Sequence, residues 1–482
     1  MSVPFERPRR SSHAAAEGEE PQVLERALDR AAGSRPIPGN TIKLLADSAA
    51  ALELMLERIA AAKSWVHFEN YIIRSDATGR RFADALAERA RAGVCVRVLY
   101  DAFGSFWTRG SLWREMIQSG VDVRAFRPLL SVPPHLAIRR DHRKFVGVDG
   151  VEAIVGGICI GDEWAGNPAR RRQPWRDTAV LIQGPAAAAL DGTFARLWAR
   201  AGEPLPPDEL VANVAARGTA SVRVVEGLPN RSRTYRAVQL LSAGAVERLW
   251  ITDAYLVAPP PLFASLIDAA KDNVDVRLLL PGVSDVPIVR AITRVGYREL
   301  LAAGARIFEW RGPMMHAKTM VADRTWTRVG SSNLNPSSLV ANYELDVLVE
   351  GTEMAEEMAA QFRRDQSWSR EIVLTPRRMR LPPRLTAAPS AVERDDAAAL
   401  PGHKRSLRER RAAAVVAFRQ AAFGLRRFVT AVASLALFGT AAALILLPQV
   451  ASVALAAVAT VLGISVGWSA VARRRRETDR GA

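Results

Sequence analysis

Two short motifs of one pattern carry the residues of this chain that are best suited to chemistry. Each has a histidine, a lysine two positions on and an aspartate five positions after the lysine: His142, Lys144 and Asp149, then His316, Lys318 and Asp323. In an extended strand, residues two apart point to the same face, so each histidine projects beside its lysine. This geometry places an imidazole next to a cation that can clamp a phosphate.

The composition of the chain shows that the two motifs are not accidental matches. The chain has six lysines against sixty arginines, and six histidines, and two of each fall in the motifs. One accidental match is expected on the order of a few times per thousand such chains. The alternative, core histidines paired with surface lysines, does not explain two matches at one offset.

That offset is 174 residues, and it also relates Gly156 to Gly330. A constant offset across four positions predicts duplication of a whole domain, with a period far too long for a solenoid. ARAGVCVRVL (90–99) and AKDNVDVRLL (270–279) add a second, looser similarity between the two parts.

Hydrophobic patterning predicts an α/β fold in which helices flank mixed sheets. Strands are expected at 41–46, 65–74 and 94–101, and helices at 50–62 and 76–93, the first capped by Asp47 or Ser48. The expected organisation is a disordered tail at 1–40, duplicated domains at 41–213 and 219–375, a Pro-rich linker at 376–402, a basic helix at 403–427, an apolar hairpin at 428–472 and a basic tail at 473–482.

The two aspartates allow two interpretations. Asp149 and Asp323 lie seven residues after their histidines, an odd offset that turns them to the other strand face. Asp149 also begins an Asp-Gly pair, a strong hairpin-turn signal. We expect both to brace a hairpin, with a catalytic contact to substrate as the alternative.

The segments after the motifs supply further candidates. Ser331 and Asn333, next to Gly330, suit a phosphate site because small residues let backbone amides approach and an amide can donate. A histidine nucleophile needs its second ring nitrogen held by an acceptor. Glu344 is the candidate for His316, and Asp177 is the candidate for His142.

Together these residues resemble the phospholipase D superfamily, in particular its bacterial cardiolipin synthase branch. The resemblance covers about residues 41–375 and includes FENYIIRSDATG, VGGICIGDEWAG, PWRDTAVLIQGPA and GSSNLNPSSLVANYE. It implies two domains packed as a pseudo-dimer around one site. It also implies a ping-pong reaction without metal or cofactor, in which His142 forms a phosphohistidine and His316 is the acid and base.

The chain departs from that pattern at Cys159, the counterpart of Asn333, where many relatives have asparagine. A thiol is a weak donor, so this half of the phosphate clamp is expected to be weaker. Trp107, Trp113 and Trp164 either touch acyl chains at the entrance or pack in the core.

Charge and hydropathy point to a membrane. The net charge of +16 favours a polyanionic partner, either nucleic acid or an anionic lipid surface. Phe428 to Ala472 contains no charged residue or histidine, and Pro448-Gln449 divides it into two stretches long enough to span a bilayer. Arginines flank both ends, which predicts a two-span anchor in the cytoplasmic membrane with cytoplasmic catalytic domains. A buried hairpin in a soluble domain is the alternative.

Two cysteines, both in strand-like runs, favour a reducing compartment.

The sequence therefore predicts a phosphatidyltransferase that converts two phosphatidylglycerols to cardiolipin and glycerol. A hydrolytic phospholipase D, a nuclease of the same superfamily and a non-enzymatic lipid-binding protein are the alternatives. Anionic phospholipid and the membrane are the expected partners, nucleic acid is not favoured, and the oligomeric state is left open.

Overall fold

The computed structural model describes residues 19–128, 136 and 138–374. The linker, basic helix, apolar hairpin and basic tail expected after residue 375 lie outside the described residues. Within the described part, no helix combines the length and the apolar character that crossing a bilayer requires.

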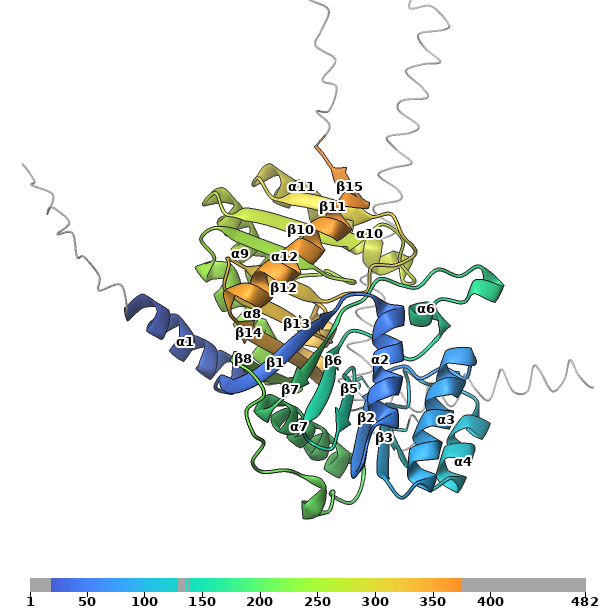
Figure 1. Ribbon diagram of the computed structural model, residues 1–482. Helices are drawn as coiled ribbons and strands as arrows, with labels where there is room; N and C mark the ends of the chain where they lie inside the picture. The colour runs from blue at the N-terminus through green and yellow to red at the C-terminus, as the bar shows by residue number, and fades with distance from the viewer. Residues whose placement is uncertain (1–18, 129–135, 137, 375–482) are drawn as a thin grey trace, which may run out of the picture. The chain divides into compact units, whose positions relative to one another are not determined.

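The first half of the described chain contributes seven strands and the second contributes eight, and helices are interspersed with them in the expected way (Figure 1). The first half contains β1 Ile37–Leu45, α2 Ser48–Ala60, β2 Trp65–Asn70, α3 Ala77–Arg91, β3 Cys95–Asp101, α4 Gly110–Gln118, β4 Asp122–Phe126, β5 Lys144–Val148, β6 Glu152–Gly156, α6 Asp162–Ala165, β7 Ala179–Gln183 and α7 Pro185–Ala201. The second half contains β8 Ala220–Gly227, α8 Arg233–Gly244, β9 Arg248–Thr252, α9 Pro260–Lys271, β10 Asp275–Pro281, α10 Pro287–Val295, α11 Tyr297–Ala302, β11 Arg306–Trp310, β12 Thr319–Ala322, β13 Trp326–Gly330, β14 Glu344–Glu350, α12 Thr352–Ser367 and an extra strand, β15 Ser369–Ile372.

The strand order shows the duplication directly. One sheet runs β15-β11-β10-β9-β12-β13-β14-β8-β1-β7-β6-β5-β2-β3-β4, so the first half reads 1-7-6-5-2-3-4 and the second reads 8-14-13-12-9-10-11. The two orders are the same after renumbering. The halves meet where β1 pairs antiparallel with β8. The sequence predicted mixed sheets in two duplicated domains, and this pairing joins the strands of both halves into one sheet.

The central strands are buried on both faces because their side chains alternate between two cores. In β5, Phe145 packs into a core shared by both halves, whereas Val146 packs into a core of the first half alone. Helices α7 and α12 enclose the shared core, in which Val180 of the first half and Val347 of the second are fully buried. The two halves are therefore joined by packing as well as by β1 and β8.

The N-terminal region departs from the expected disordered tail over residues 19–40. Helix α1, Glu19–Ala32, packs against α8 and β8 of the second half. Leu28 and Ala32 are fully buried in the core of that half, and Asp29 accepts a hydrogen bond of 2.8 Å from Arg223. The Arg- and Glu-rich composition concealed an amphipathic pattern in which one face has small and apolar side chains.

Asp149 and Asp323 brace backbone and lie away from the histidines. Both follow a short strand that begins beside its histidine, which places them roughly 20 Å along the chain from it. Asp149 has a φ of +51° and accepts the backbone N–H groups of Ser64 at 2.7 Å, Trp65 at 2.9 Å and Lys63 at 3.0 Å.

Asp323 repeats this arrangement, with a φ of +52° and acceptor contacts to the N–H groups of Val246, Glu247 and Arg248. The bracing interpretation is confirmed for both residues. A direct catalytic role for the aspartates is wrong, because each carboxylate is committed to the chain segment that enters the neighbouring strand.

Replacing Asp149 should therefore lower the free energy of unfolding and leave catalytic turnover nearly unchanged. Asp149→Ala leaves three N–H groups without this acceptor, and we expect a loss of about 2–4 kcal/mol. Asp149→Asn keeps an acceptor oxygen and tolerates a positive φ, so its loss should be smaller. Urea unfolding measures both, and turnover per folded molecule should stay within about twofold of the unchanged chain. A stable but inactive Asp149→Ala protein would contradict this assignment.

Candidate active site

The histidines lie just before β5 and β12, at the edge of the sheet that is formed by the ends of the strands. Lys144, the first residue of β5, pairs with Asn70 at the carboxyl end of β2. Thr319, the first residue of β12, pairs with Thr252 at the carboxyl end of β9. The site thus lies where β2, β3, β9 and β10 end and where the motif strands begin.

Each histidine is held by backbone of the other half of the chain. The N–H of His142 donates to the carbonyl of Tyr343 at 2.9 Å, and the N–H of Tyr343 donates to Arg140 at 2.9 Å. The second half repeats this exchange, because the N–H of His316 donates to the carbonyl of Arg176 at 2.7 Å. The segments before β14 and β7 therefore cross to the opposite motif.

This exchange decides which carboxylate orients which histidine. Glu344 follows Tyr343, and its Oε2 lies 3.0 Å from Nδ1 of His142. Asp177 follows Arg176, and its Oδ2 lies 2.6 Å from Nδ1 of His316. Both carboxylates bind a histidine, as expected, but the predicted pairing was wrong. The sequence suggested pairing within a half, and the structure pairs each histidine with the other half.

Both histidines are poised as neutral bases. Burial lowers the pKa of His142, and burial with the charge of Lys318 lowers the pKa of His316 to about 4. Burial works to raise the pKa of Asp177 and Glu344, but the lysines and histidines beside them outweigh it and lower both. The ionised carboxylates accept from Nδ1, so each Nε2 carries the free lone pair.

The lysines place positive charge beside both rings. The ammonium groups of Lys144 and Lys318 donate to the backbone carbonyls of His142 and His316. Lys318 Nζ also lies 2.9 Å from Nδ1 of His316, but that nitrogen donates its single proton to Asp177 at the shorter distance. Burial lowers the pKa of Lys318 to about 8, despite the opposing effect of Asp177.

A cavity of about 340 Å³ joins the two motifs. Both histidines line it, together with Cys159 and Asn333, so the expected phosphate-binding pair faces the same space. Aromatic rings form much of its wall: Tyr71 meets His142 edge-on at 4.8 Å between ring centres, and Trp164 meets His316 at 5.3 Å. Of the three tryptophans considered from the sequence, Trp164 lines this cavity, whereas Trp113 stacks on Tyr100.

Two hydrogen bonds hold the segments that contain Asn333 and Cys159, one from the residue after β9 and one from the last residue of β2. Asp253 accepts the N–H of Leu334 at 2.8 Å, and Asn70 donates to the carbonyl of Ile158 at 3.3 Å. The amide oxygen of Asn333 is buried and has no hydrogen-bond partner among the described residues. A buried acceptor of this kind at a cavity wall is suited to contact a hydrogen-bond donor on a ligand.

Ser331 does not face the cavity, and its expected phosphate contact is wrong. Its hydroxyl donates to Glu344 Oε2 and accepts the N–H of Leu345 at 2.9 Å. Ser331 therefore supports the carboxylate that orients His142, and it contributes to the site only through that carboxylate.

Sequence reasoning missed a buried charged group behind the first motif. Glu69, Asp141 and Arg143 are fully buried, and Arg143 donates to Glu226 at 3.1 Å. Burial raises the pKa of Glu69 to about 7 and raises that of Asp141 well above its usual value. The pKa of each carboxyl is therefore shifted toward the protonated form. Glu69 lies in the FENYIIR segment, but no spacing rule distinguishes it from a surface residue.

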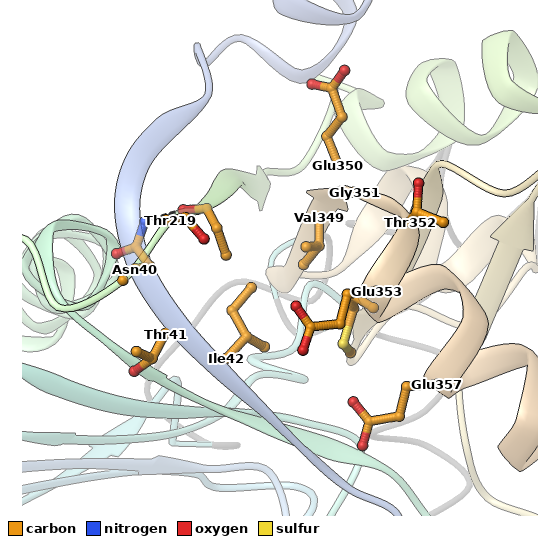
Figure 2. Close-up of a pocket in the computed structure, with 13 residues that line it drawn as sticks. Asn40, Thr41, Ile42, Thr219, Val349, Glu350, Gly351, Thr352, Glu353 and Glu357 are labelled. Atoms are coloured by element: carbon orange, nitrogen blue, oxygen red, sulfur yellow. Dashed lines mark hydrogen bonds between the residues drawn. The ribbon is translucent and has the colours of Figure 1, made fainter.

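A second cavity, of about 440 Å³, lies away from this chemistry (Figure 2). Asn40 and Ile42 of β1 line one side of it, and Glu353 and Glu357 extend from α12 on the other. No motif histidine or lysine lines it, and its acidic side chains would repel a phosphate. We therefore place the candidate active site at the two histidines.

Comparisons with known proteins match both halves of the chain. A family model described as cardiolipin synthase, PLD-like domain, matches residues 55–198 and 238–366, one segment in each half. The chain is 33% identical over 356 residues to cardiolipin synthase A of Pseudomonas aeruginosa strain PAO1, a match that covers 73% of this chain and 72% of that protein.

Cardiolipin synthase A of Pseudomonas syringae pv. syringae strain B728a is 31% identical over 369 residues, covering 76% of this chain and 77% of that protein. The crystal structure of phosphatidylserine synthase from Haemophilus influenzae Rd KW20 superposes with a TM-score of 0.57 at 13% identity, covering 73% of this chain and 92% of that one. At that identity, the likeness concerns the fold alone.

The perturbed groups predict a distinctive pH profile. Since burial holds both histidines neutral, turnover should persist well below the usual histidine pKa of about 6.5 as the pH falls. Loss of the Lys318 charge should lower turnover as the pH rises through about 8.

In Lys318→Arg the guanidinium stays charged, so any remaining turnover should show no decline near pH 8. Rates measured from about pH 4 to about pH 10 test this. A decline that is unchanged in Lys318→Arg would assign it to another group.

Proposed function

Because the chain belongs to the family of cardiolipin synthases with PLD-like domains, we propose that it is a phosphatidyltransferase that makes cardiolipin. In the proposed reaction, a phosphatidyl group passes from one phosphatidylglycerol to a glycerol hydroxyl of a second, and free glycerol is released. The observation that supports this most is the pair of neutral histidines, each held by a carboxylate of the other half and both facing one cavity.

The first step forms the covalent intermediate. Nε2 of His142 attacks phosphorus, the bond from phosphorus to the headgroup glycerol oxygen breaks, and His316 gives a proton from its Nε2 to that oxygen. The negative phosphodiester raises the pKa of the ring beside it, so one histidine of the pair is protonated when substrate is bound. Asp177 and Glu344 stabilise whichever ring carries positive charge.

The second step reverses the roles. A glycerol hydroxyl of the incoming phosphatidylglycerol gives its proton to His316 and attacks the same phosphorus. The bond from phosphorus to Nε2 of His142 then breaks, which frees cardiolipin and restores the enzyme. Lys144 and Lys318 neutralise charge on the equatorial oxygens in both transition states, and the amide N–H of Asn333 donates to them; donors of this kind commonly contribute several kcal/mol each. Cys159, the counterpart of Asn333, is the weaker donor.

Purified full-length protein with phosphatidylglycerol labelled in its headgroup tests the proposal. We expect cardiolipin and free labelled glycerol in equal amounts, and a loss of about a thousandfold or more in both His142→Ala and His316→Ala. Lys144→Ala and Lys318→Ala should also lose turnover, whereas Lys271→Ala, which changes an exposed lysine on α9, should not.

The products separate the alternatives. Phosphatidic acid as the main product would make the protein a hydrolase that uses water as acceptor. No turnover of any phospholipid by folded protein would reject lipid chemistry. A phosphatidyl adduct on His142 that persists in His316→Ala, detected by mass spectrometry, identifies His142 as nucleophile, and an adduct found on His316 would reverse the assignment.

We also propose that the apolar run from Phe428 to Ala472 anchors the chain in the cytoplasmic membrane, with the catalytic halves on the cytoplasmic side. Arginines on both flanks of the run support this orientation.

In a Cys95→Ser background, Gln449→Cys at the centre of the run should react with an impermeant maleimide added to intact cells. The natural Cys95, which is exposed in the first half, should react only after the cells are opened. Labelling of Cys95 in intact cells would contradict the orientation.

A further inference from the structure

Both halves carry exposed apolar side chains at the edge of the sheet that holds the histidines. Strands β3 and β10 run parallel to β2 and β9, so all four end at this edge. The segment after β3 and the segment after β10 therefore leave the sheet beside the cavity. Each of these segments presents apolar side chains to solvent.

The first segment is an aromatic loop, defined by Phe103, Phe106 and Trp107. Phe103 and Phe106 are each 56% exposed and Trp107 is 80% exposed, with the last two rings in edge-on contact at 5.0 Å. The loop is tied down from within, because Asp101 accepts the N–H groups of Phe103 and Gly104 and Ser105 donates to the carbonyl of Tyr71. These rings are thus held outward by a fixed backbone.

The second segment is the outer face of α10, defined by Ile288, Ile292 and Val295. These residues recur at helical spacing and are 70%, 49% and 78% exposed. The inner face is anchored: Thr293 donates to the carbonyl of Leu256 at 2.8 Å, and Arg294 forms an ion pair with Glu309. A helix fixed on its polar side and apolar on its open side is the reverse of a soluble surface helix.

Both segments adjoin the cavity. Tyr71, on which the aromatic loop is built, lines it, as do Asp285 and Val286 immediately before α10. Exposed arginines accompany the apolar side chains, Arg109 after the aromatic loop and Arg298 after α10. Apolar and aromatic groups with basic neighbours match the interface of an anionic bilayer, where tryptophan is enriched and amphipathic helices lie flat.

We propose that the aromatic loop and the outer face of α10 insert into the leaflet that supplies the phospholipid. Headgroups then reach the histidines without leaving the bilayer, while the acyl chains stay among the apolar side chains at the cavity mouth. This inference rests on the proposed function for its substrate. It assigns membrane contact to the catalytic halves, independently of any anchor elsewhere in the chain.

Trp107 reports its own position. The chain has eleven tryptophans, so the difference in emission between the unchanged protein and Trp107→Phe isolates that residue. With full-length protein on phosphatidylglycerol vesicles, this component should shift to shorter wavelength. It should also lose most of its intensity when bromine is placed on the acyl chains near the headgroup, relative to unbrominated vesicles.

A kinetic test uses the same surface. The pairs Phe106→Ser with Trp107→Ser, and Ile288→Ser with Ile292→Ser, should each lower turnover on vesicles about tenfold or more. Turnover of short-chain phosphatidylglycerol dispersed as monomers should stay within about twofold. Val246→Ser removes an equally exposed apolar side chain, 77% exposed, at the opposite edge beside Asp323, and should change neither rate.

The outcomes are distinct. An unquenched Trp107, or equal losses on vesicles and monomers, would overturn the docking surface and leave those side chains to a protein partner or to local structure. Quenching needs no turnover, so it can be measured even if the proposed reaction fails. Failure of the proposed function appears separately, as a missing cardiolipin product from the unchanged protein.

Discussion

The active site depends on one reciprocal exchange of hydrogen bonds between the two halves. Backbone at Tyr343 holds His142, backbone at Arg176 holds His316, and the carboxylate that follows each contact fixes the ring. A neutral imidazole with a committed Nδ1 is useful only if its Nε2 faces the reacting phosphorus. Neither half can meet that condition alone, so the shared core and the pairing of β1 with β8 serve the chemistry directly.

The two halves repeat the same strand order but give their histidines different surroundings. Behind the first motif, Arg143 lies among buried carboxyls, whereas the matching position of the second motif is Ala317 in an apolar core. In the cavity, Cys159 of the first half takes the position that corresponds to Asn333 of the second. A two-step transfer needs one histidine that bonds to phosphorus and one that carries protons. The two halves share one strand order but surround their histidines with different residues. This difference allows two chemically identical rings to have different roles.

Much of the fold and part of the candidate site could be predicted from the sequence. Strand alternation and the offset between His142 and His316 gave the repeated α/β units, and the odd spacing of Asp149 indicated its place at a turn. The pairing of carboxylates was missed because it depends on which segments cross between halves, and spacing along a chain carries no such information. Helix α1 was missed because arginine and glutamate content obscured Leu28 and Ala32, whose partners lie about two hundred residues later. Ser331 illustrates a subtler failure: Asn333 nearby lines the cavity, but the direction of one hydroxyl decides whether Ser331 meets substrate or Glu344.

Helix α1 has a consequence for the way the chain is made. Its apolar face is covered by α8, whose residues leave the ribosome long after α1 does. At a synthesis rate of about 5–20 residues per second, that interval is roughly 10–40 seconds. During it the nascent first half also lacks β8, the neighbour of β1, so an unpaired strand edge and an uncovered helix emerge together. During synthesis, the apolar face of α1 is therefore exposed to chaperones or to aggregation. This exposure ends only when the second half has been made and has folded against α1.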